Sequence, residues 1–229
     1  MKKILILGGS SDIGVSLSKK LLLNKKNNIY LHSNETKIEK SLLNKVKNIK
    51  VNIKNINQNN IKKKFDNDYD IIVNLIGYTS NQSFIDFKIK ELQKTIYINS
   101  IIPLLIIKQS LNHMIKNKFG RIVNTSSVGV KFGGGSNTFG YSLSKHINEF
   151  MPNYIRTLSS NNIFYNVLRI GVTNTKIHKK ILNKSLKKRA QLIPSKKIAT
   201  TEDISNYLYF LINDNNFITN EVINITGGE

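Results

Sequence analysis

Tyr141 and Lys145 are the residues of this chain whose types and spacing could most directly do chemistry. They stand four residues apart in the stretch Tyr-Ser-Leu-Ser-Lys, shortly after the serine pair Ser126-Ser127. Four residues are about one helical turn, so both side chains would project from the same face of a helix. An ammonium group beside a phenol lowers the pKa of the phenol from about 10, and such a phenol can act as a general acid or base. The spacing alone also fits an ordinary surface pair on a helix.

A glycine-rich turn near the N-terminus is the second feature that could bind a ligand. The apolar run Ile4-Leu5-Ile6-Leu7 suits a buried parallel strand, and Gly-Gly-Ser-Ser-Asp-Ile-Gly follows it at residues 8–14. Apolar residues then recur with helical spacing over residues 15–22. In this context glycines let the backbone approach a pyrophosphate, and the helix N-terminus supplies N–H groups and a positive dipole end. The pattern favours a dinucleotide site over an ordinary glycine-rich turn.

Seven segments of the chain, in matching order, resemble the short-chain dehydrogenase/reductase family, of the single-domain type that includes the 3-oxoacyl-acyl-carrier-protein reductases. The family's Thr-Gly-x-x-x-Gly-x-Gly turn corresponds to residues 7–14, and its Asn-Asn-Ala-Gly corresponds to residues 74–77. The other correspondences are a helix asparagine at Asn99, a serine strand at residues 120–127, the Tyr141 and Lys145 pair, residues 169–175, and a final strand with Gly-Gly at residues 218–228. Seven segments in order make a specific signal, whereas any one of them alone is weak.

The resemblance implies a catalytic set of Asn99, Ser127, Tyr141 and Lys145. Tyr141 would donate a proton to a carbonyl oxygen while hydride reaches the carbon from a nicotinamide, and it would act as the base in the reverse reaction. Lys145 would lower the pKa of the tyrosine and bind the nicotinamide ribose, Ser127 would hydrogen-bond the same carbonyl oxygen, and Asn99 would help to hold a proton-relay water. We choose Ser127 over Ser126 because aligning the strand with that of the family puts the second serine in position. Its distance to Tyr141 is one residue longer than in many relatives, which predicts a loop insertion at residues 131–137.

The resemblance also implies a nicotinamide cofactor, and the residues favour NADP over NAD. No acid precedes Glu35 at the end of the second expected strand to bind a ribose 2′-hydroxyl, whereas Ser33, Asn34 and Lys37 could accommodate a 2′-phosphate. The expected cofactor contacts are Gly8, Ser10, Ser11, Asp12, Ile13, Gly14, Ser33, Asn34, Asn52, Ile53, Asn74, Leu75, Gly77, Tyr141, Lys145, Gly171, Val172, Thr173 and Thr175. No metal site is expected.

The chain departs from the family pattern at several positions. Asp12 replaces the middle glycine of the turn, where a carboxylate is unfavourable near a pyrophosphate unless it points away. Asn52 replaces the aspartate expected near the adenine, and Ile170 replaces the usual proline. Pro152 falls inside the expected helix of Tyr141, which in relatives packs at a subunit interface, and proline there can kink the helix.

The alternation of strand and helix patterns predicts one α/β domain over residues 1–229, a Rossmann-like doubly wound parallel sheet of about seven strands with helices on both faces. Strands are expected at residues 3–7, 28–32, 49–53, 71–75, 121–125, 163–170 and 221–225. Helices are expected near residues 13–26, 34–47, 58–66, 88–117, 141–160, 176–188 and 201–213. Ligands would bind beyond the carboxyl ends of the strands, where the glycine turn, Asn74, Ser127 and Gly171 would converge.

Composition excludes several classes of function. The chain has no cysteine, so disulfides, zinc-thiolate sites and thiol catalysis are excluded. Its formal net charge of +21 could indicate a nucleic-acid partner, but lysine, asparagine and isoleucine are enriched throughout, as a biased genome would produce. The densest basic cluster, residues 176–189, falls in the family's lid over the substrate and could attract an anionic substrate or be a solvated helix face. No apolar run reaches the length of a membrane span, and we expect a cytoplasmic homodimer or homotetramer.

The sequence therefore predicts an NAD(P)-dependent oxidoreductase that acts on a carbonyl group or secondary alcohol. The substrates it leaves open are 3-oxoacyl thioesters on a carrier protein, sugars and small ketones. Two alternatives from other classes are a catalytically silent cofactor-binding regulatory or partner subunit and a nucleic-acid binder driven by charge. The complete set of serine, tyrosine, lysine and asparagine argues against a silent subunit.

Overall fold

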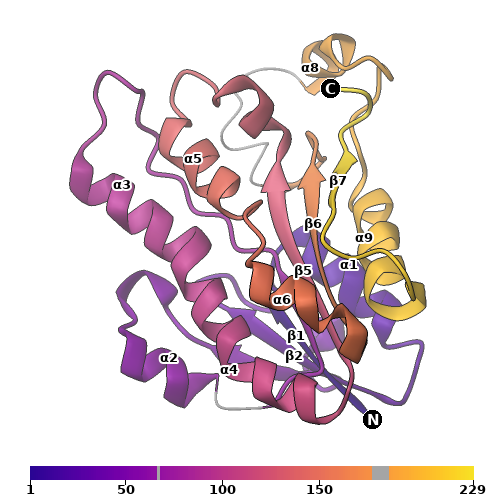
Figure 1. Ribbon diagram of the computed structural model, residues 1–229. Coiled ribbons are helices and arrows are strands. Elements are labelled where there is room, and N and C mark those ends of the chain that lie inside the picture. Colours follow the sequence, from indigo (N-terminus) through magenta and orange to yellow (C-terminus); the bar gives the residue numbers. More distant parts are fainter. Residues whose placement is uncertain (66–67, 177–185) are drawn as a thin grey trace.

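The protein is built around one parallel sheet (Figure 1). A computed structural model describes residues 1–65, 68–176 and 186–229. Within them the strands pair in the order β3-β2-β1-β4-β5-β6-β7, and every pairing is parallel. The strands are β1 (Lys2–Leu7), β2 (Asn27–Ser33), β3 (Lys47–Lys50), β4 (Ile71–Asn74), β5 (Gly120–Ser127), β6 (Ile163–Ile170) and β7 (Val222–Ile225). The prediction of a doubly wound sheet is confirmed, and the strand order reverses direction between β1 and β4, which is where such sheets bind ligands.

The helices alternate with the strands, as the sequence pattern predicts. The α-helices are α1 (Asp12–Leu21), α2 (Gln58–Lys64), α3 (Ile89–Ile96), α4 (Ile102–Lys116), α5 (Phe139–Ile147), α6 (Asn153–Thr157), α8 (Leu186–Leu192) and α9 (Thr201–Tyr209). Short 3₁₀ turns are η1 (Lys40–Leu42), η2 (Ile53–Asn55), η4 (Val128–Phe132) and η5 (Leu158–Asn161), and π-helical turns are η3 (Tyr97–Ile101) and η6 (Phe210–Asp214). The first helix begins at its Ser11 cap, whose hydroxyl accepts from the main-chain N–H of Gly14 at 3.2 Å.

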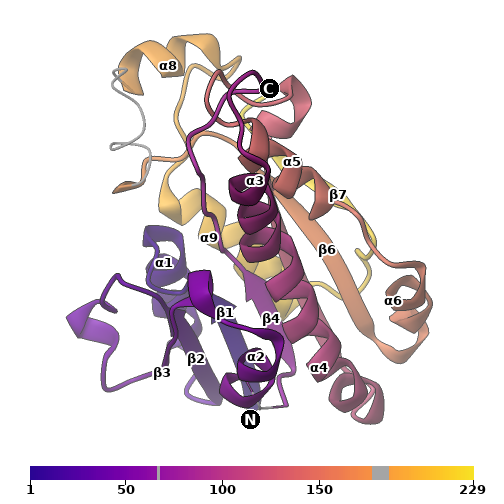
Figure 2. The same cartoon turned by 90° about the vertical axis from the view of Figure 1, so that its left-hand side faces the viewer.

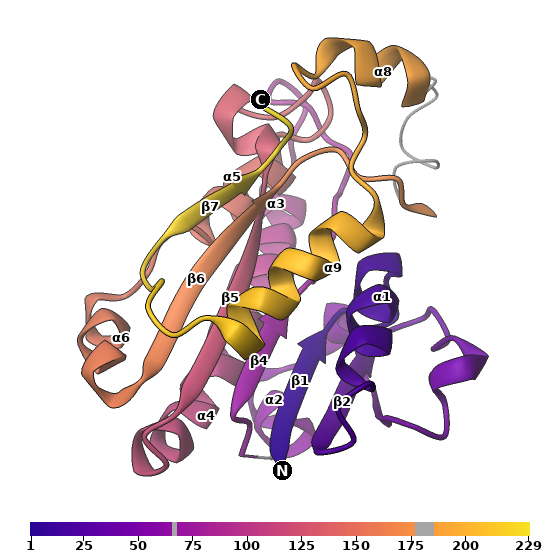
Figure 3. The same cartoon turned by 90° about the vertical axis from the view of Figure 1, so that its right-hand side faces the viewer.

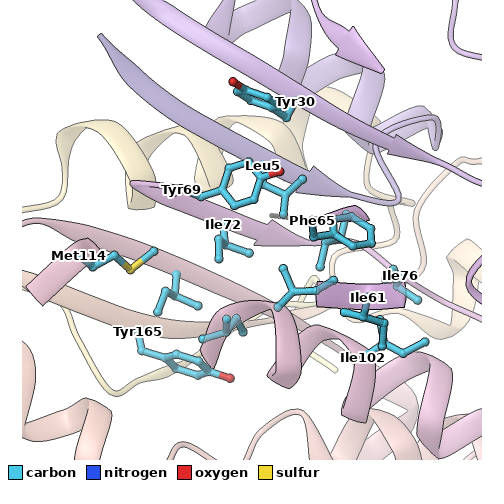
Figure 4. Packing of buried hydrophobic residues seen from close by; sticks show 14 of the residues in the cluster. Leu5, Tyr30, Ile61, Phe65, Tyr69, Ile72, Ile76, Ile102, Met114 and Tyr165 are labelled. Atoms are coloured by element: carbon cyan, nitrogen blue, oxygen red, sulfur yellow. The ribbon is translucent and has the colours of Figure 1, made fainter. Parts of the chain in front are cut away.

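Two apolar layers hold the helices to the sheet. On one face, α1 and α9 lie side by side over the inner strands (Figure 3) and bury Leu17 and Leu208 in one cluster with Ile4 and Ile6. On the other face, α2, α3 and α4 cover the sheet (Figure 2). There Leu5 and the other alternate strand residues pack against helix side chains in a second cluster (Figure 4). Successive strand residues point to opposite faces, so one apolar run such as that of β1 serves both layers.

Two helix predictions are wrong. The expected helix at 34–47 is replaced by the short turn η1 and the start of β3 at Lys47, and Ile38 and Leu42 reach the core without a full helix. The expected helix at 141–160 stops at Ile147 and resumes as α6, with Pro152 at the cap position of α6. This interruption agrees with the prediction that proline would disturb the helix. Most of the expected helix at 176–188, including Lys179, lies outside the described residues.

Candidate active site

The turn after β1 is shaped so that its backbone can lie close to a ligand. Gly8 has a φ of +70°, and a Cβ there would come within 2.9 Å of the main-chain oxygen of Leu75. A Cβ on Gly14 would come within 2.6 Å of the main-chain oxygen of Gly9, so the start of α1 also requires glycine. Ser10 and Ile13 complete the turn, and α1 begins directly after it, so the N–H groups of its first turn lie at the carboxyl end of β1. This geometry fits the pyrophosphate of a dinucleotide.

A buried histidine, which the sequence analysis did not single out, supports this turn. His32 is buried in β2, and its Nδ1 accepts from the main-chain N–H of Gly8 at 3.2 Å. Its Nε2 lies 3.0 Å from the main-chain oxygen of Val51, so the proton of the neutral ring lies on Nε2. Burial lowers the pKa of His32, which keeps the ring neutral and its Nδ1 free to accept. The signal in the sequence was a polar residue directly after the apolar residues of β2, whereas its position beside the glycine turn follows only from the fold.

Asp12, the residue in place of a family glycine, points away from the turn. Its Oδ2 accepts from the main-chain N–H of Lys176 at 2.7 Å, and its Oδ1 lies 3.6 Å from the Nζ of Lys176. The carboxylate therefore joins α1 to the segment after β6. This contact removes the electrostatic objection to an acid beside a bound pyrophosphate.

The end of β2 carries an unmatched polar atom where an adenosine ribose is expected. The Oδ1 of Asn34 is buried and has no hydrogen-bond partner within the described ranges. The hydroxyl of Ser33 donates to the Oδ1 of Asn48 at 2.8 Å, and the Oδ1 of Asn52 accepts from the main-chain N–H of Lys54 at 3.1 Å. Buried polar atoms are normally satisfied, so an orphan here is what a ligand-binding site would leave. Ile53 is buried beside them and supplies an apolar surface.

After β4, the side chain of Asn74 makes internal hydrogen bonds, whereas Gly77 lies next to Tyr141. The side chain of Asn74 is fully buried and internal, since its Nδ2 donates to Asn124 at 2.6 Å and its Oδ1 accepts from the N–H of Ile76 at 3.0 Å. Leu75 lies against the glycine turn through its main chain. Gly77 lies against Tyr141, because a Cβ there would come 3.7 Å from the tyrosine ring. The turn after β1 and the tyrosine are thus joined by one short segment.

The segment after β6 forms the far side of the site. The N–H of Gly171 donates to the main-chain oxygen of Ile225 at 2.8 Å, which anchors the segment to β7. Val172 accepts from the N–H of Ala199 at 3.1 Å, and the hydroxyl of Thr173 donates to the main-chain oxygen of Gly171 at 3.0 Å. Thr175 follows, directly before the residue that binds Asp12.

Tyr141 lies in the first turns of α5, with Ser127 beside it at the end of β5. A hydrogen bond with Ser127 lowers the pKa of Tyr141, but burial outweighs this bond and raises that pKa to about 12. The hydroxyl of Ser127 also accepts from the N–H of Gly129 at 3.3 Å, which orients it at the cap of η4. After η4, Gly133 and Gly134 turn the chain with positive φ. The phenol is therefore protonated at neutral pH, a state suited to a proton donor.

The lysine contacts main-chain oxygens and not the phenol. Lys145 is 2% exposed, and its Nζ donates to the oxygen of Ile76 at 2.8 Å and to the oxygen of Thr125 at 3.0 Å. Its Nζ lies 5.8 Å from the centre of the Tyr141 ring. Burial lowers the pKa of Lys145 to about 7. The prediction that the lysine lowers the pKa of the tyrosine is wrong for the protein alone, because burial dominates both groups.

Comparison with known proteins agrees with this geometry. The family model described as Enoyl-(Acyl carrier protein) reductase matches residues 44–229. The chain is 30% identical over 242 residues to the 3-oxoacyl-[acyl-carrier-protein] reductase FabG of Buchnera aphidicola subsp. Baizongia pistaciae, covering 99% of this chain and 97% of that protein. The chain belongs to the short-chain dehydrogenase/reductase family.

Two further comparisons extend this finding. The FabG of Aquifex aeolicus is 29% identical over 181 residues, covering 76% of this chain and 73% of the relative. Among solved structures, one described as ElxO with NADP bound superposes with a TM-score of 0.81 at 27% identity, covering 99% of this chain and 98% of that chain. This chain is therefore an oxidoreductase of the short-chain dehydrogenase/reductase family.

In this dehydrogenase/reductase, Asn99 is a fully buried connector within the π-helical turn η3. Its Oδ1 accepts from the N–H of Tyr78 and its Nδ2 donates to Ser144, each at 2.8 Å. Its main-chain oxygen accepts from the Nδ2 of Asn148 at 3.1 Å, and Asn148 also donates to the main-chain oxygen of Thr125 at 3.3 Å. Asn148, which the sequence analysis did not single out, therefore links Asn99 to the main-chain oxygen of Thr125, which Lys145 also binds.

The other serine of the pair belongs to a separate network of this reductase. The hydroxyl of Ser126 donates to the Oε1 of Glu149 at 2.6 Å, and Arg169 binds the same carboxylate with two nitrogens at 2.7 Å each. Hydrogen bonds from the arginine and the serine hold the pKa of Glu149 below its usual range, against the opposing effect of burial. Ser126 thus faces away from Tyr141, which supports the choice of Ser127.

Proposed function

We propose that this protein reduces a carbonyl group of a 3-oxoacyl thioester with NADPH, with Tyr141 as the proton donor. The observation that carries the proposal is the meeting of Tyr141, Ser127 and Gly77 at the end of the sheet that also holds the glycine turn. The names of the curated relatives point to the same substrate class. The nicotinamide, when bound, supplies the hydride.

The residues of this chain would do the remaining work. Ser127 would hold the carbonyl oxygen, and Tyr141 would give its proton to that oxygen as negative charge develops on it. A phenol with a pKa of about 12 keeps its proton at neutral pH and is still far more acidic than an alcohol. Lys145, with a pKa of about 7, would bind the ribose hydroxyls. It would also supply the proton that replaces the one lost from Tyr141. Asn99 and Asn148 would keep the surrounding carbonyls fixed.

The cofactor assignment rests on the fit of the described residues. The positive φ of Gly8 and the crowding at Gly14 leave a backbone cradle for the pyrophosphate. No acid stands before Glu35 at the end of β2, which favours NADP over NAD. The orphan Oδ1 of Asn34 is an acceptor there, to which a hydroxyl of the adenosine ribose would donate. The solved structure of ElxO carries NADP. None of the helices in the described ranges has the length and apolarity that a membrane span requires. We further propose a cytoplasmic enzyme that works as a homodimer or homotetramer.

The test is oxidation of NADPH, and in parallel of NADH, with acetoacetyl-N-acetylcysteamine as substrate. We expect turnover by the wild type and a fall in kcat of about 100-fold or more in Tyr141→Phe, because the proton donor is lost. Tyr154→Phe is the matched control, since Tyr154 is exposed in α6, and it should keep full activity. Fluorescence titration with NADPH should show unchanged binding in Tyr141→Phe. Cofactor binding without reduction of any carbonyl would refute the proposal.

The description of the matching family model raises enoyl reduction as a second candidate. The same assay with crotonyl-N-acetylcysteamine distinguishes the two. Loss of the enoyl absorbance would favour reduction of the carbon–carbon double bond, whereas turnover of the oxo substrate alone would favour the carbonyl reaction.

A further inference from the structure

Two cations from separate elements bind the same acidic residue, Glu229, one at its main chain and one at its side-chain carboxylate. Lys131 lies in η4, four residues after Ser127, and Arg189 lies in α8. Lys131 donates through Nζ to the main-chain oxygen of Glu229, and Arg189 donates to its Oε1. Figures 1 and 3 show this end of the chain, marked C, beside α8 at the end of the molecule to which β5 and β6 point. Lys131 thus lies in the turn that follows Ser127, and Glu229 links Arg189 to it.

The carboxylate is held but incompletely satisfied. The side chain of Glu229 is 8% exposed, and its Oε2 is buried with no hydrogen-bond partner within the ranges described. The hydroxyl of Thr226 donates to the main-chain oxygen of Glu229 at 2.9 Å. A buried carboxylate oxygen without a donor costs free energy. Lys131 and Arg189 therefore make a site that favours an anion, and Glu229 fills it with one carboxylate oxygen left without a hydrogen bond.

We propose that Lys131 and Arg189 form a subsite for the anionic end of the substrate, and that Glu229 occupies this subsite until the substrate displaces it. The proposal rests on the proposed function and adds the recognition of a phosphate-bearing arm. Ser127 caps η4, the turn that carries Lys131, and the N–H of Gly129 in that turn donates to the hydroxyl of Ser127 at 3.3 Å. An arm that leaves the thioester along η4 would bring its phosphate to Lys131.

The chemistry of the two side chains suits a phosphate. The guanidinium group presents a planar fork that matches phosphate oxygens, and the lysine adds a compact charge from the opposite element. Lys131 is exposed and Arg189 is half-buried, so both can be reached from solvent. A purely structural clamp would predict equal effects of these residues on every substrate, whereas a subsite predicts effects that depend on the charge of the substrate.

The experiment compares two substrates with the same reacting group. Acetoacetyl-CoA carries phosphates and acetoacetyl-N-acetylcysteamine carries none, so the ratio of their kcat/KM values reports the subsite. We expect Lys131→Ala and Arg189→Gln each to lower this ratio about five-fold, and Glu229→Gln to raise it, because the competing charge is gone. Lys116→Ala, an exposed lysine at the far end of α4, is the control and should leave the ratio unchanged.

The outcomes separate this proposal from the proposed function. An unchanged ratio in Lys131→Ala and Arg189→Gln would overturn the subsite, and a lowered ratio in Glu229→Gln would overturn the displacement by substrate. If the wild type reduces neither thioester, the proposed function fails while the subsite is decided by calorimetric titration of CoA into protein saturated with NADP⁺. Weaker binding of CoA by Lys131→Ala would then support the subsite, and equal binding would reject it. Circular dichroism spectra of all variants establish that they are folded.

Discussion

The buried lysine makes a quantitative prediction about stability and pH. Lys145 is 2% exposed, and burial lowers its pKa from 10.5 to about 7. The unfolded chain keeps the ordinary lysine pKa, so between pH 7 and pH 10.5 it binds a proton that the folded chain does not. The free energy of unfolding should therefore rise with pH through this window. Since one pKa unit corresponds to about 1.4 kcal/mol, the whole window amounts to about 5 kcal/mol.

The perturbation that isolates this effect is Lys145→Met, which removes the titrating group and keeps an unbranched side chain. At any single pH the two proteins differ for several reasons, because methionine also leaves the oxygens of Ile76 and Thr125 without their donor. Those contributions do not depend on pH. The difference in unfolding free energy should move in favour of the wild type by about 1.4 kcal/mol for each pH unit above 7 and level off below pH 7.

The assay is urea denaturation at each half pH unit from 6 to 9.5, followed by far-ultraviolet circular dichroism because the chain has no tryptophan. Lys116→Met serves as the control, since Lys116 is exposed and its replacement should give a difference that is flat with pH. A difference between wild type and Lys145→Met that is equally flat would show that the buried ammonium keeps its ordinary pKa. That result would refute the reasoning from burial.

Two further pairs of substitutions test the site itself. Gly8→Ala should lower the unfolding free energy by about 2 kcal/mol or more and weaken NADPH binding at least ten-fold, since it adds both a strained φ and a close contact. Gly133→Ala has a similar φ with open space around it, so it should cost about 1 kcal/mol and leave NADPH affinity unchanged in the same titration. Ser127→Ala should lower kcat by about 100-fold at unchanged stability. Ser126→Ala should keep kcat and lower the unfolding free energy by about 1 kcal/mol, because it breaks the bond to Glu149; equal kcat losses in both serine variants would contradict the assignment.

The elements that position the site were predictable because their signals are local. The apolar run of β1, the glycines after it and the Ser11 cap of α1 are adjacent in the chain, and each has one favourable conformation. Pro152 likewise lies between α5 and α6, at the cap position of α6, where its missing N–H is tolerated. Such features do not depend on what the rest of the chain does.

The helix expected at residues 34–47 shows where local signals fail. Ile38 and Leu42 have helical spacing, and both are buried. A single 3₁₀ turn is enough to place them in the core, and the ion pair of Lys19 with Glu39 at 2.8 Å holds the segment to α1. An isolated helix of this length has little stability of its own, so these tertiary contacts decide the conformation.

Other parts of the site depend on contacts between distant residues and were therefore missed. The bond from Gly8 to His32 spans 24 positions, and the bonds of Asn148 to Asn99 and Thr125 span 49 and 23. A histidine or an asparagine in the sequence does not reveal which carbonyl or N–H it will meet. The same holds for Glu229, whose partners lie 98 and 40 positions away.

The tyrosine and lysine pair combines both situations. The spacing of Tyr141 and Lys145 correctly predicted one helix, because both lie in α5. The prediction that Lys145 lowers the pKa of Tyr141 was wrong, because it assumed that the ammonium group faces the phenol. The carbonyls of Ile76 and Thr125, at the ends of β4 and β5, draw the ammonium to themselves, and burial then raises the pKa of the phenol and lowers that of the lysine. A phenol that keeps its proton at neutral pH suits the role of proton donor that we propose for Tyr141, which is the direction that reduction of a carbonyl requires.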